Sequence, residues 1–197
     1  MEVLNSEDKS IELIGIKLKV KKGVFNPDER ITNSTSLVLN NLPMLRDKEV
    51  LDIGCGTGII AIACALGGAK KVVAVDVDKN SLENAKINVK ANSVQDKVEV
   101  IESDLFDKVQ GKFDYIFANL PISDKHWNLS VSTLDLVKKF VIESLNHTKE
   151  NGKIYIVWAS FSKVSPLKQF FKEKRYSYIE IKQRKLNRMW YLFEISL

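Results

Sequence analysis

The chain has 197 residues, of which 45% are hydrophobic and 28% charged, and its formal net charge is +5. A chain of this size buries roughly two-thirds of its unfolded surface, so we expect a single domain over residues 1–197. No apolar run reaches the roughly 18 residues of a membrane helix, and the first ten residues do not resemble a signal peptide. These observations argue against membrane and secreted proteins, and we expect a cytoplasmic one.

Metal and disulfide chemistry is disfavoured by the residue inventory. The chain has two cysteines, Cys55 and Cys64, and two histidines, His126 and His147. This is too few for a disulfide framework or a zinc site. We therefore expect no metal, and we interpret both cysteines as small packing residues.

The N-terminal part predicts a hairpin followed by a helix. Residues 11–20 alternate between apolar and polar side chains, and Lys21-Lys22-Gly23 then turns the chain. A helical pattern follows at about residues 34–42. We interpret residues 1–47 as a hairpin and lid over a core formed by residues 48–197.

After residue 48, short β-rich runs alternate with helical patterns, as in βαβ units of a parallel sheet. The predicted strands are residues 49–54, 71–78, 98–104, 113–121, 152–160, 176–185 and 189–197. The predicted helices are residues 57–66, 81–91 (after Asn80 as its cap), 132–146 and 165–175. About three residues separate the last two strands, which should therefore pair antiparallel. We expect an α/β fold with a seven-stranded, mostly parallel sheet, helices on both faces and an antiparallel C-terminal strand, plus the N-terminal hairpin and helix.

A glycine-rich loop follows the first strand of this core. Val50-Leu51-Asp52-Ile53-Gly54-Cys55-Gly56-Thr57-Gly58 runs from an apolar strand into a helix, where open α/β sheets bind ligands. Its glycines let a ligand approach the backbone, and the helix N-terminus offers unpaired N–H groups. The dinucleotide fingerprint needs its third glycine at the position of Ile59, so a nicotinamide or flavin cofactor is disfavoured.

Two further acids end the next strands. Asp76 ends the second strand, where a carboxylate can accept hydrogen bonds from ribose hydroxyls. Asp104, in Glu102-Ser103-Asp104-Leu105, ends the third and suits an adenine amino group. A single acid of this kind is more often a turn or cap residue, but three successive strands that end this way predict a binding site.

Residues 50–58, 68–78, 103–105 and 113–121 resemble the successive motifs of class I, Rossmann-like methyltransferases that bind S-adenosylmethionine. The resemblance is close over residues 48–121. It implies that Asp52 and the loop residues hold the methionine part of the cofactor, that Asp76 holds the ribose, and that Val77 packs on the adenine. Asp104 and the backbone of Leu105 would bind the adenine edge. The loop residues in this set are Gly54, Cys55, Gly56, Thr57 and Gly58.

The fourth strand ends in Asn119-Leu120-Pro121-Ile122, which is similar to the Asn-Pro-Pro-Tyr motif of amino-methyltransferases. The Asn119 side-chain oxygen and a backbone carbonyl near Leu120 would accept both N–H groups of a planar nitrogen and aim its lone pair at the methyl group. We therefore predict Asn119, Leu120 and Pro121 as catalytic residues, with Asn119 also beside the cofactor. Ile122 replaces the aromatic residue that would stack on a flat substrate.

Other residues are weaker candidates for this site. Phe25 or Trp127 would supply the missing aromatic face, although a core position is the simpler interpretation of either, and His126 would accept a proton. Residues 23–39 are similar to the entry segment of the methyltransferase small families, which places Thr32 and Ser34 toward the site.

The basic charge is concentrated near the C-terminus. Residues 163–188 carry nine Lys or Arg against two Glu, a net +7, whereas the rest of the chain carries −2. This distribution fits contact with phosphates or, equally, a solvated helix and strand face.

These features favour an N-methyltransferase that acts on an amino nitrogen of RNA or of a translation-related protein, with residues 163–188 as a possible contact for either partner. A small-molecule N- or O-methyltransferase and a noncatalytic cofactor-binding subunit stay open, as does the oligomeric state.

Overall fold

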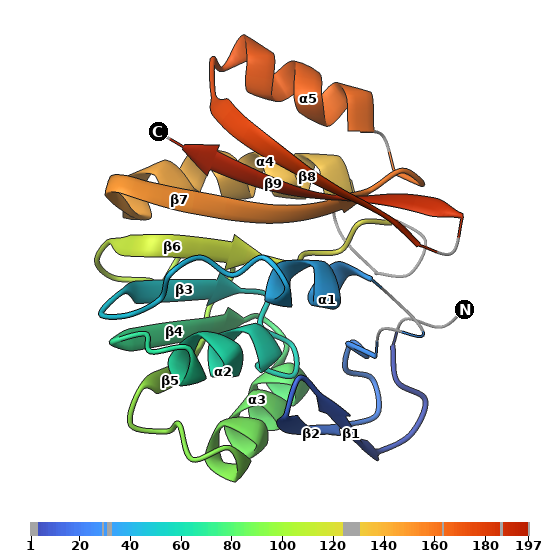
Figure 1. Cartoon of the computed structure of the whole chain (residues 1–197), viewed down its shortest axis with the longest axis vertical. Helices are drawn as coiled ribbons and strands as arrows, with labels where there is room; N and C mark the ends of the chain where they lie inside the picture. Colours follow the sequence, from blue (N-terminus) through green and yellow to red (C-terminus); the bar gives the residue numbers. More distant parts are fainter. Residues whose placement is uncertain are drawn as a thin grey trace.

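The computed structural model describes residues 4–28, 30, 33–123, 131–162, 164–185 and 187–196. A seven-stranded sheet has the order β5-β4-β3-β6-β7-β9-β8 (Figure 1). Its strands are β3 (Glu49–Ile53), β4 (Lys71–Asp76), β5 (Val98–Glu102), β6 (Phe113–Ala118), β7 (Thr148–Ala159), β8 (Ser177–Lys185) and β9 (Arg188–Ser196). Strands β5 to β7 pair in parallel, and β9 pairs antiparallel with both β7 and β8. The predicted fold class is confirmed.

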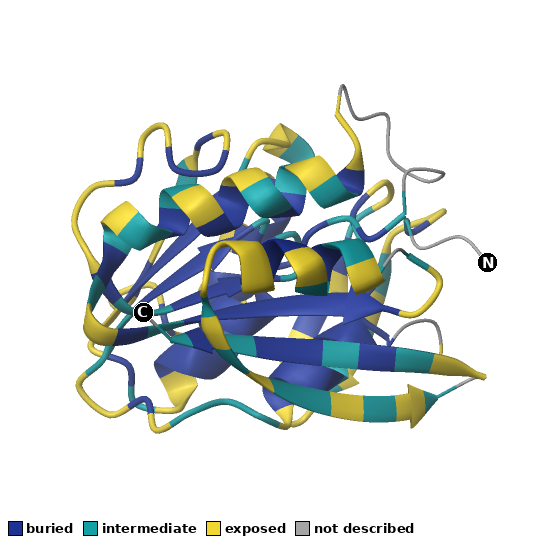
Figure 2. Cartoon of the chain, turned by 90° about the horizontal axis from the view of Figure 1, so that it is seen from above, coloured by how far each residue is buried: buried dark blue, intermediate teal, exposed yellow. Residues whose placement is uncertain are grey.

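Helices cover both faces of the sheet (Figures 1 and 2). Helices α1 (Ser34–Leu39), α2 (Ile59–Leu66) and α3 (Lys79–Ala91) lie on one face, and α4 (Thr133–Ser144) and α5 (Val164–Glu173) lie on the other. A short 3₁₀ turn, η1 (Leu145–His147), follows α4.

The core follows from the apolar central strands. In β3, β4 and β6 most side chains are buried, as is typical of parallel strands covered on both faces. These strands are enclosed between helices, of which α3, α4 and α5 have exposed outer faces and α1 and α2 are almost entirely buried. Figure 2 shows that the edge strand β8 alternates between exposed and half-buried residues. The carboxyl ends of β3 to β6 meet at one edge, where the functional site lies.

The N-terminal hairpin is attached to α3 by a row of asparagine side chains. Strand β1 (Lys9–Leu13) pairs with β2 (Ile16–Val20), and β2 presents its other edge to α3. The asparagines that bond the backbone along this edge, from residue 17 to residue 22, are Asn80, Asn84, Asn88 and Asn92. Four residues advance about 6 Å along a helix, and two residues advance about 6.7 Å along a strand. Because these two distances are similar, asparagines spaced four residues apart on α3 reach about every second residue of β2.

Asn88 is the central member of this row. Its side chain accepts from Lys19 N at 2.8 Å and donates to Lys19 O and Thr57 O, both at 2.9 Å. Asn84 and Asn88 are fully buried. The row therefore satisfies a strand edge that would otherwise be open, and Asn88 also ties the hairpin to the glycine loop.

Two local predictions were wrong. Helix α3 begins at Lys79 and its cap is Asp78, whose carboxylate accepts from Ser81 N at 2.9 Å, whereas Asn80 donates to the hairpin. Strand β7 begins at Thr148 rather than residue 152, because Asn151 and Gly152 lie in a bulge of the strand and not in a turn before it.

Within the described ranges, no helix is both long enough and apolar enough to span a bilayer.

Candidate active site

A cavity of about 1210 Å³ opens at the carboxyl ends of the parallel strands. Its lining comes from loops that follow β3, β4, β5 and β6, from the N-terminal segment, and from α4 and β9. Single-ligand pockets occupy roughly 300–1000 Å³, so this cavity has room for two ligands side by side.

The glycine loop forms the floor of one end of the cavity. The N–H groups of Gly54 and Cys55 both donate to Val75 O, at 2.8 and 2.9 Å, which fixes the loop to the end of β4. Gly56 has φ +54°, and a Cβ added there would meet no atom within 4 Å. Gly58 has φ +80°, and its added Cβ would lie 3.2 Å from Ala85 on α3. Gly56 therefore leaves space for a ligand, whereas Gly58 permits close packing of two helices.

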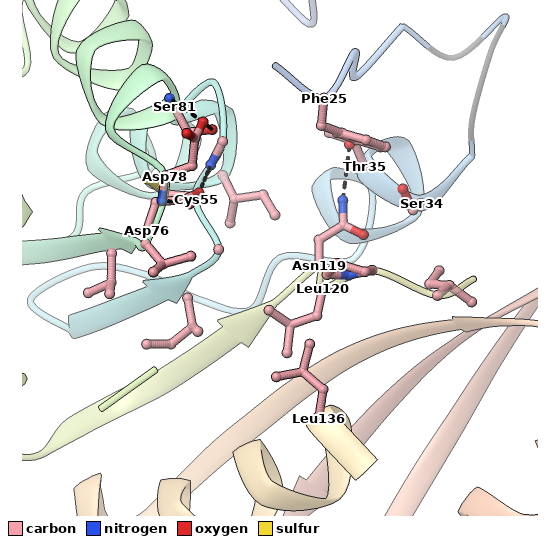
Figure 3. Close-up of a pocket in the computed structure, with 18 of the residues that line it drawn as sticks. Phe25, Ser34, Thr35, Cys55, Asp76, Asp78, Ser81, Asn119, Leu120 and Leu136 are labelled. Carbon is pink, nitrogen blue, oxygen red and sulfur yellow. Dashed lines mark hydrogen bonds between the residues drawn. The ribbon is translucent and has the colours of Figure 1, made fainter. Parts of the chain in front are cut away.

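Asp76 joins this loop to α3. One of its carboxylate oxygens accepts from Gly56 N at 2.9 Å and the other from Asp78 N at 3.0 Å (Figure 3). Burial raises the pKa of Asp76 above its ordinary value, and the bonds from these backbone N–H groups counteract that rise. Each oxygen retains a lone pair for a ligand donor, because it accepts one backbone bond and lines the cavity.

Asp52 lies beneath the loop and outside the cavity lining. It is fully buried, and one of its oxygens accepts from Ala61 N in α2 at 3.1 Å. The other oxygen has no hydrogen-bond partner among the described residues. Burial raises the pKa of Asp52 to about 7, and the negative charge of Asp76 adds to this rise. Asp52 therefore fixes the start of α2 beneath the loop.

Cys55 lines the cavity but is not a nucleophile. Burial, followed by the negative charges of Asp52 and Asp76, raises the pKa of its thiol well above the ordinary value. A thiol that stays protonated is a weak nucleophile, so this side chain forms an apolar wall.

The side of the cavity next to the loop is formed by the ends of β4 and β5. Val77 is 66% exposed and lies between Asp76 and the exposed Asp78 at the end of β4. Asp104 is exposed and Leu105 is buried, with a φ of +45° that turns the chain after β5. All these residues line the cavity.

Asn119 stands between this end and the rest of the cavity. Its Nδ2 donates to Thr35 Oγ1 of α1 at 3.3 Å (Figure 3). Thr35 is 1% exposed, so its hydroxyl is held by the packing of α1. The side-chain oxygen of Asn119 is the atom of this amide that Thr35 does not engage. Phe25 lines the cavity on the same side of Asn119 as Thr35, where Figure 3 shows its ring.

The far end of the cavity combines cations and aromatic rings. Lys139 comes from α4, Phe161 from the turn after β7, and Arg188 and Trp190 from β9. The Arg188 guanidinium carbon lies 4.8 Å from the centre of the Phe161 ring, and the Phe161 and Trp190 rings meet edge to face at 5.7 Å.

Most of the predicted site residues come together in this cavity. The predicted residues that line it are Gly54, Cys55, Gly56, Thr57, Asp76, Val77, Asp104, Leu105, Asn119, Leu120, Pro121 and also Phe25 and Ser34. Asp52 and Gly58 lie behind its wall. Thr32, His126 and Trp127 fall outside the described residues.

Sequence reasoning missed Thr35, Lys139, Phe161 and Trp190. Thr35 lies in the entry segment, residues 23–39, beside the predicted Ser34, whereas the other three stand outside every motif that the sequence offers. Ile122 lines the cavity and stands where the related tetrapeptide has an aromatic residue. The tetrapeptide of this chain therefore provides no aromatic ring to the cavity.

The basic segment is divided between the two ends of the sheet. Ser177, the first residue of β8, pairs with Ser196, which also pairs with Lys153 near the amino end of the parallel strands. Lys172, Lys174 and Arg175 precede Ser177, so they lie far from the cavity. The β8–β9 turn, with Arg188, lies at the cavity end; Lys163 is outside the described residues. Residues 163–188 therefore do not form one continuous face beside the cavity.

Comparison with known proteins places the chain in a family. The model of the methyltransferase small domain matches residues 15–184. A putative protein N5-glutamine methyltransferase of Methanocaldococcus jannaschii is 39% identical over 164 residues, which are 77% of this chain and 80% of that protein. A ribosomal protein L11 methyltransferase of Thermotoga neapolitana is 36% identical over 153 residues, which are 76% of this chain and 57% of the relative.

A solved structure shares the fold at low sequence identity. The T. thermophilus 16S rRNA N2 G1207 methyltransferase, in complex with AdoMet and guanosine, has a TM-score of 0.72 and 22% identity. The match covers 96% of this chain and 50% of that one. The chain thus spans about half the length of two of these three proteins.

Proposed function

This chain belongs to the methyltransferase small domain family, and from that premise we propose that it methylates a planar nitrogen of RNA or of a protein. The predicted S-adenosylmethionine-dependent methyltransferase is confirmed by the family match and by the named relatives. Those relatives are named for action on glutamine, on a ribosomal protein and on rRNA. The acceptor proposed here shares a nitrogen as the methylated atom with the two proteins whose names state one, the N5-glutamine and the N2 G1207 methyltransferases.

The residues of the loop end fit S-adenosylmethionine. The open space over Gly56 suits a ligand that lies against the backbone, and the free lone pairs of Asp76 suit the two ribose hydroxyls. Val77 offers an apolar contact for the adenine, and Asp104 with the Leu105 backbone suits its polar edge. When bound, S-adenosylmethionine supplies a methyl group carried on a positively charged sulfur.

Asn119 is the residue that we assign to methyl transfer. Because its Nδ2 is engaged by Thr35, the side-chain oxygen is the atom that faces an incoming N–H group. A second N–H would be accepted by a backbone carbonyl near Leu120. With both N–H bonds held, the nitrogen lone pair is directed out of its π-system, and catalysis is mainly positioning.

Methyl transfer in this arrangement needs little help from a general base. A neutral planar nitrogen attacks without prior loss of a proton and becomes cationic and acidic after transfer. Its proton then passes to water or to a nearby acceptor. The fixed orientation of the Asn119 amide is the single observation that carries the proposal.

The test is transfer of labelled methyl from S-adenosylmethionine into a cell extract that lacks this enzyme, separated into RNA, protein and small molecules. We expect label in RNA or protein with wild type and about 10²–10³-fold less with Asn119→Ala at saturating cofactor. Label confined to small molecules, or equal transfer by the variant, would overturn the proposal.

A further inference from the structure

We propose that the far end of the cavity binds a nucleotide of RNA through Arg188, Phe161 and Lys139, so that RNA is the acceptor. This rests on the proposed function, because it identifies which of the two macromolecules enters the site. Three observations carry it: the distribution of charge in the cavity, the Arg188–Phe161 stack, and the exposed Phe161 ring with Trp190 behind it.

Charge in the cavity is segregated by end. The loop end has the carboxylates of Asp76, Asp78 and Asp104, whereas the far end has Lys139 and Arg188. A ligand with hydroxyl donors suits the first end, and an anion suits the second. Because phosphate is repelled by carboxylates, an RNA strand would enter from the cationic end.

Arg188 is arranged to contact a phosphate. Its guanidinium lies over the Phe161 ring at 4.8 Å, which orients the guanidinium without using its N–H groups. No carboxylate of the described residues forms an ion pair with Arg188, whereas Lys168 and Lys182 of the same basic segment both contact Glu180. Lys139 lies 3.8 Å from Glu143, one turn along α4, at a distance that leaves its remaining donors available.

The aromatic rings supply what the tetrapeptide lacks. Phe161 is 44% exposed at the cavity and is supported by the buried Trp190. Single-stranded RNA is commonly held by stacking of unpaired bases on aromatic rings and arginine planes. A glutamine side chain needs neither a stacking platform nor a phosphate contact, so these residues favour RNA over protein.

The probe is a fluorescein-labelled 12-nucleotide single-stranded RNA of mixed sequence, bound to the full chain in the presence of S-adenosylhomocysteine. Fluorescence anisotropy is measured across a salt series. Arg188→Gln should weaken binding about tenfold and reduce the log–log salt slope by about 0.7, the value for one phosphate contact. Phe161→Leu should weaken binding with little change in that slope, because it removes stacking and leaves the charge.

Lys172→Gln is the matched control. It removes one positive charge from the same basic segment, but on an exposed residue of α5 far from the cavity. Its RNA affinity and salt slope should stay close to those of wild type. Equal losses in Lys172→Gln and Arg188→Gln would show only general charge attraction and would overturn the inference.

Two readouts separate this inference from the proposed function. Calorimetric affinity for S-adenosylhomocysteine should be unchanged in Arg188→Gln, which also shows that the variant is folded. Methyl transfer into protein that is insensitive to Arg188→Gln would overturn the RNA assignment and leave the proposed function intact. Absence of transfer into both RNA and protein would overturn both.

Discussion

Replacement of Thr35 by valine tests whether the amide of Asn119 must be held in one orientation. Valine has nearly the shape of threonine but lacks the hydroxyl that accepts from Asn119 Nδ2 at 3.3 Å. The buried position of Thr35 means that water cannot easily replace this hydroxyl. The amide then loses one fixed partner and rotates more freely at the position where it should meet the acceptor.

The size of the effect follows from one neutral hydrogen bond. Its net contribution is about 0.5–1.5 kcal/mol, which corresponds to about a 2- to 13-fold fall in the rate of methyl transfer. Asn119→Ala removes the acceptor oxygen itself and should cost about 10²–10³. Thr35→Ser restores the hydroxyl and should recover most of the rate.

The assay is single-turnover methyl transfer at saturating S-adenosylmethionine, with the affinity for S-adenosylhomocysteine measured alongside. Thr35→Val should change the rate and leave the cofactor affinity near that of wild type. In the Asn119→Ala background, Thr35→Val should have no further effect, because the amide that it orients is gone. Additive losses in the double variant would refute the positioning role and assign Thr35 to the packing of α1.

Five other substitutions test separate parts of the site and the fold. Asp76→Ala should weaken S-adenosylhomocysteine binding by about 1–3 kcal/mol in calorimetry, and an unchanged affinity would remove the ribose assignment. Asp52→Asn should stabilise the protein at pH 8 by up to about 4 kcal/mol, because a carboxyl with a pKa of about 7 when folded and 3.8 when unfolded opposes folding as pH rises through that interval. Urea unfolding should show this gain shrinking toward pH 4, and a gain independent of pH would contradict it. Gly58→Ala should lower stability by about 1–3 kcal/mol through its left-handed backbone and its contact with α3, whereas Gly56→Ala should lower cofactor affinity more than it lowers stability. Asn88→Ala should destabilise the protein by about 3 kcal/mol in urea, since it leaves Lys19 N and Thr57 O without their partner.

The sequence predicted the sheet well because the physical signal is local. The inner strands are continuous apolar runs, and short connections distinguish the antiparallel β8–β9 pair from the parallel strands. Boundaries were less predictable. Asn80 has the composition of a cap, but its amide bonds the backbone of Lys22, a partner 58 residues away that a local pattern cannot reveal.

The candidate site was likewise predicted in part, from the residues at the ends of the parallel strands. Residues at the ends of β3 to β6 were found because parallel strands bring their carboxyl ends to one edge, whatever the details of packing. Thr35, Phe161 and Trp190 were missed because they reach the cavity through the placement of α1, of the turn after β7 and of β9. Gly58 was assigned to the ligand, but its contact with Ala85 shows that helix packing also requires a glycine in such a loop.

The position of β9 between β7 and β8 has a consequence for the order of folding. Strand β8 precedes β9 in the chain but contacts the sheet only through it, so β8 cannot join the sheet until β9 is in place. The pair can form first as a local hairpin through Asn187, whose φ is +59°, and then dock on β7 as a unit. That docking brings in Arg188 and Trp190 and also Gln183, which accepts from the Asn33 side chain at the start of α1 at 2.8 Å. The loop end of the cavity is assembled from neighbouring βα units, whereas its far end and the anchor of α1 are completed together, when the β8–β9 pair docks on β7.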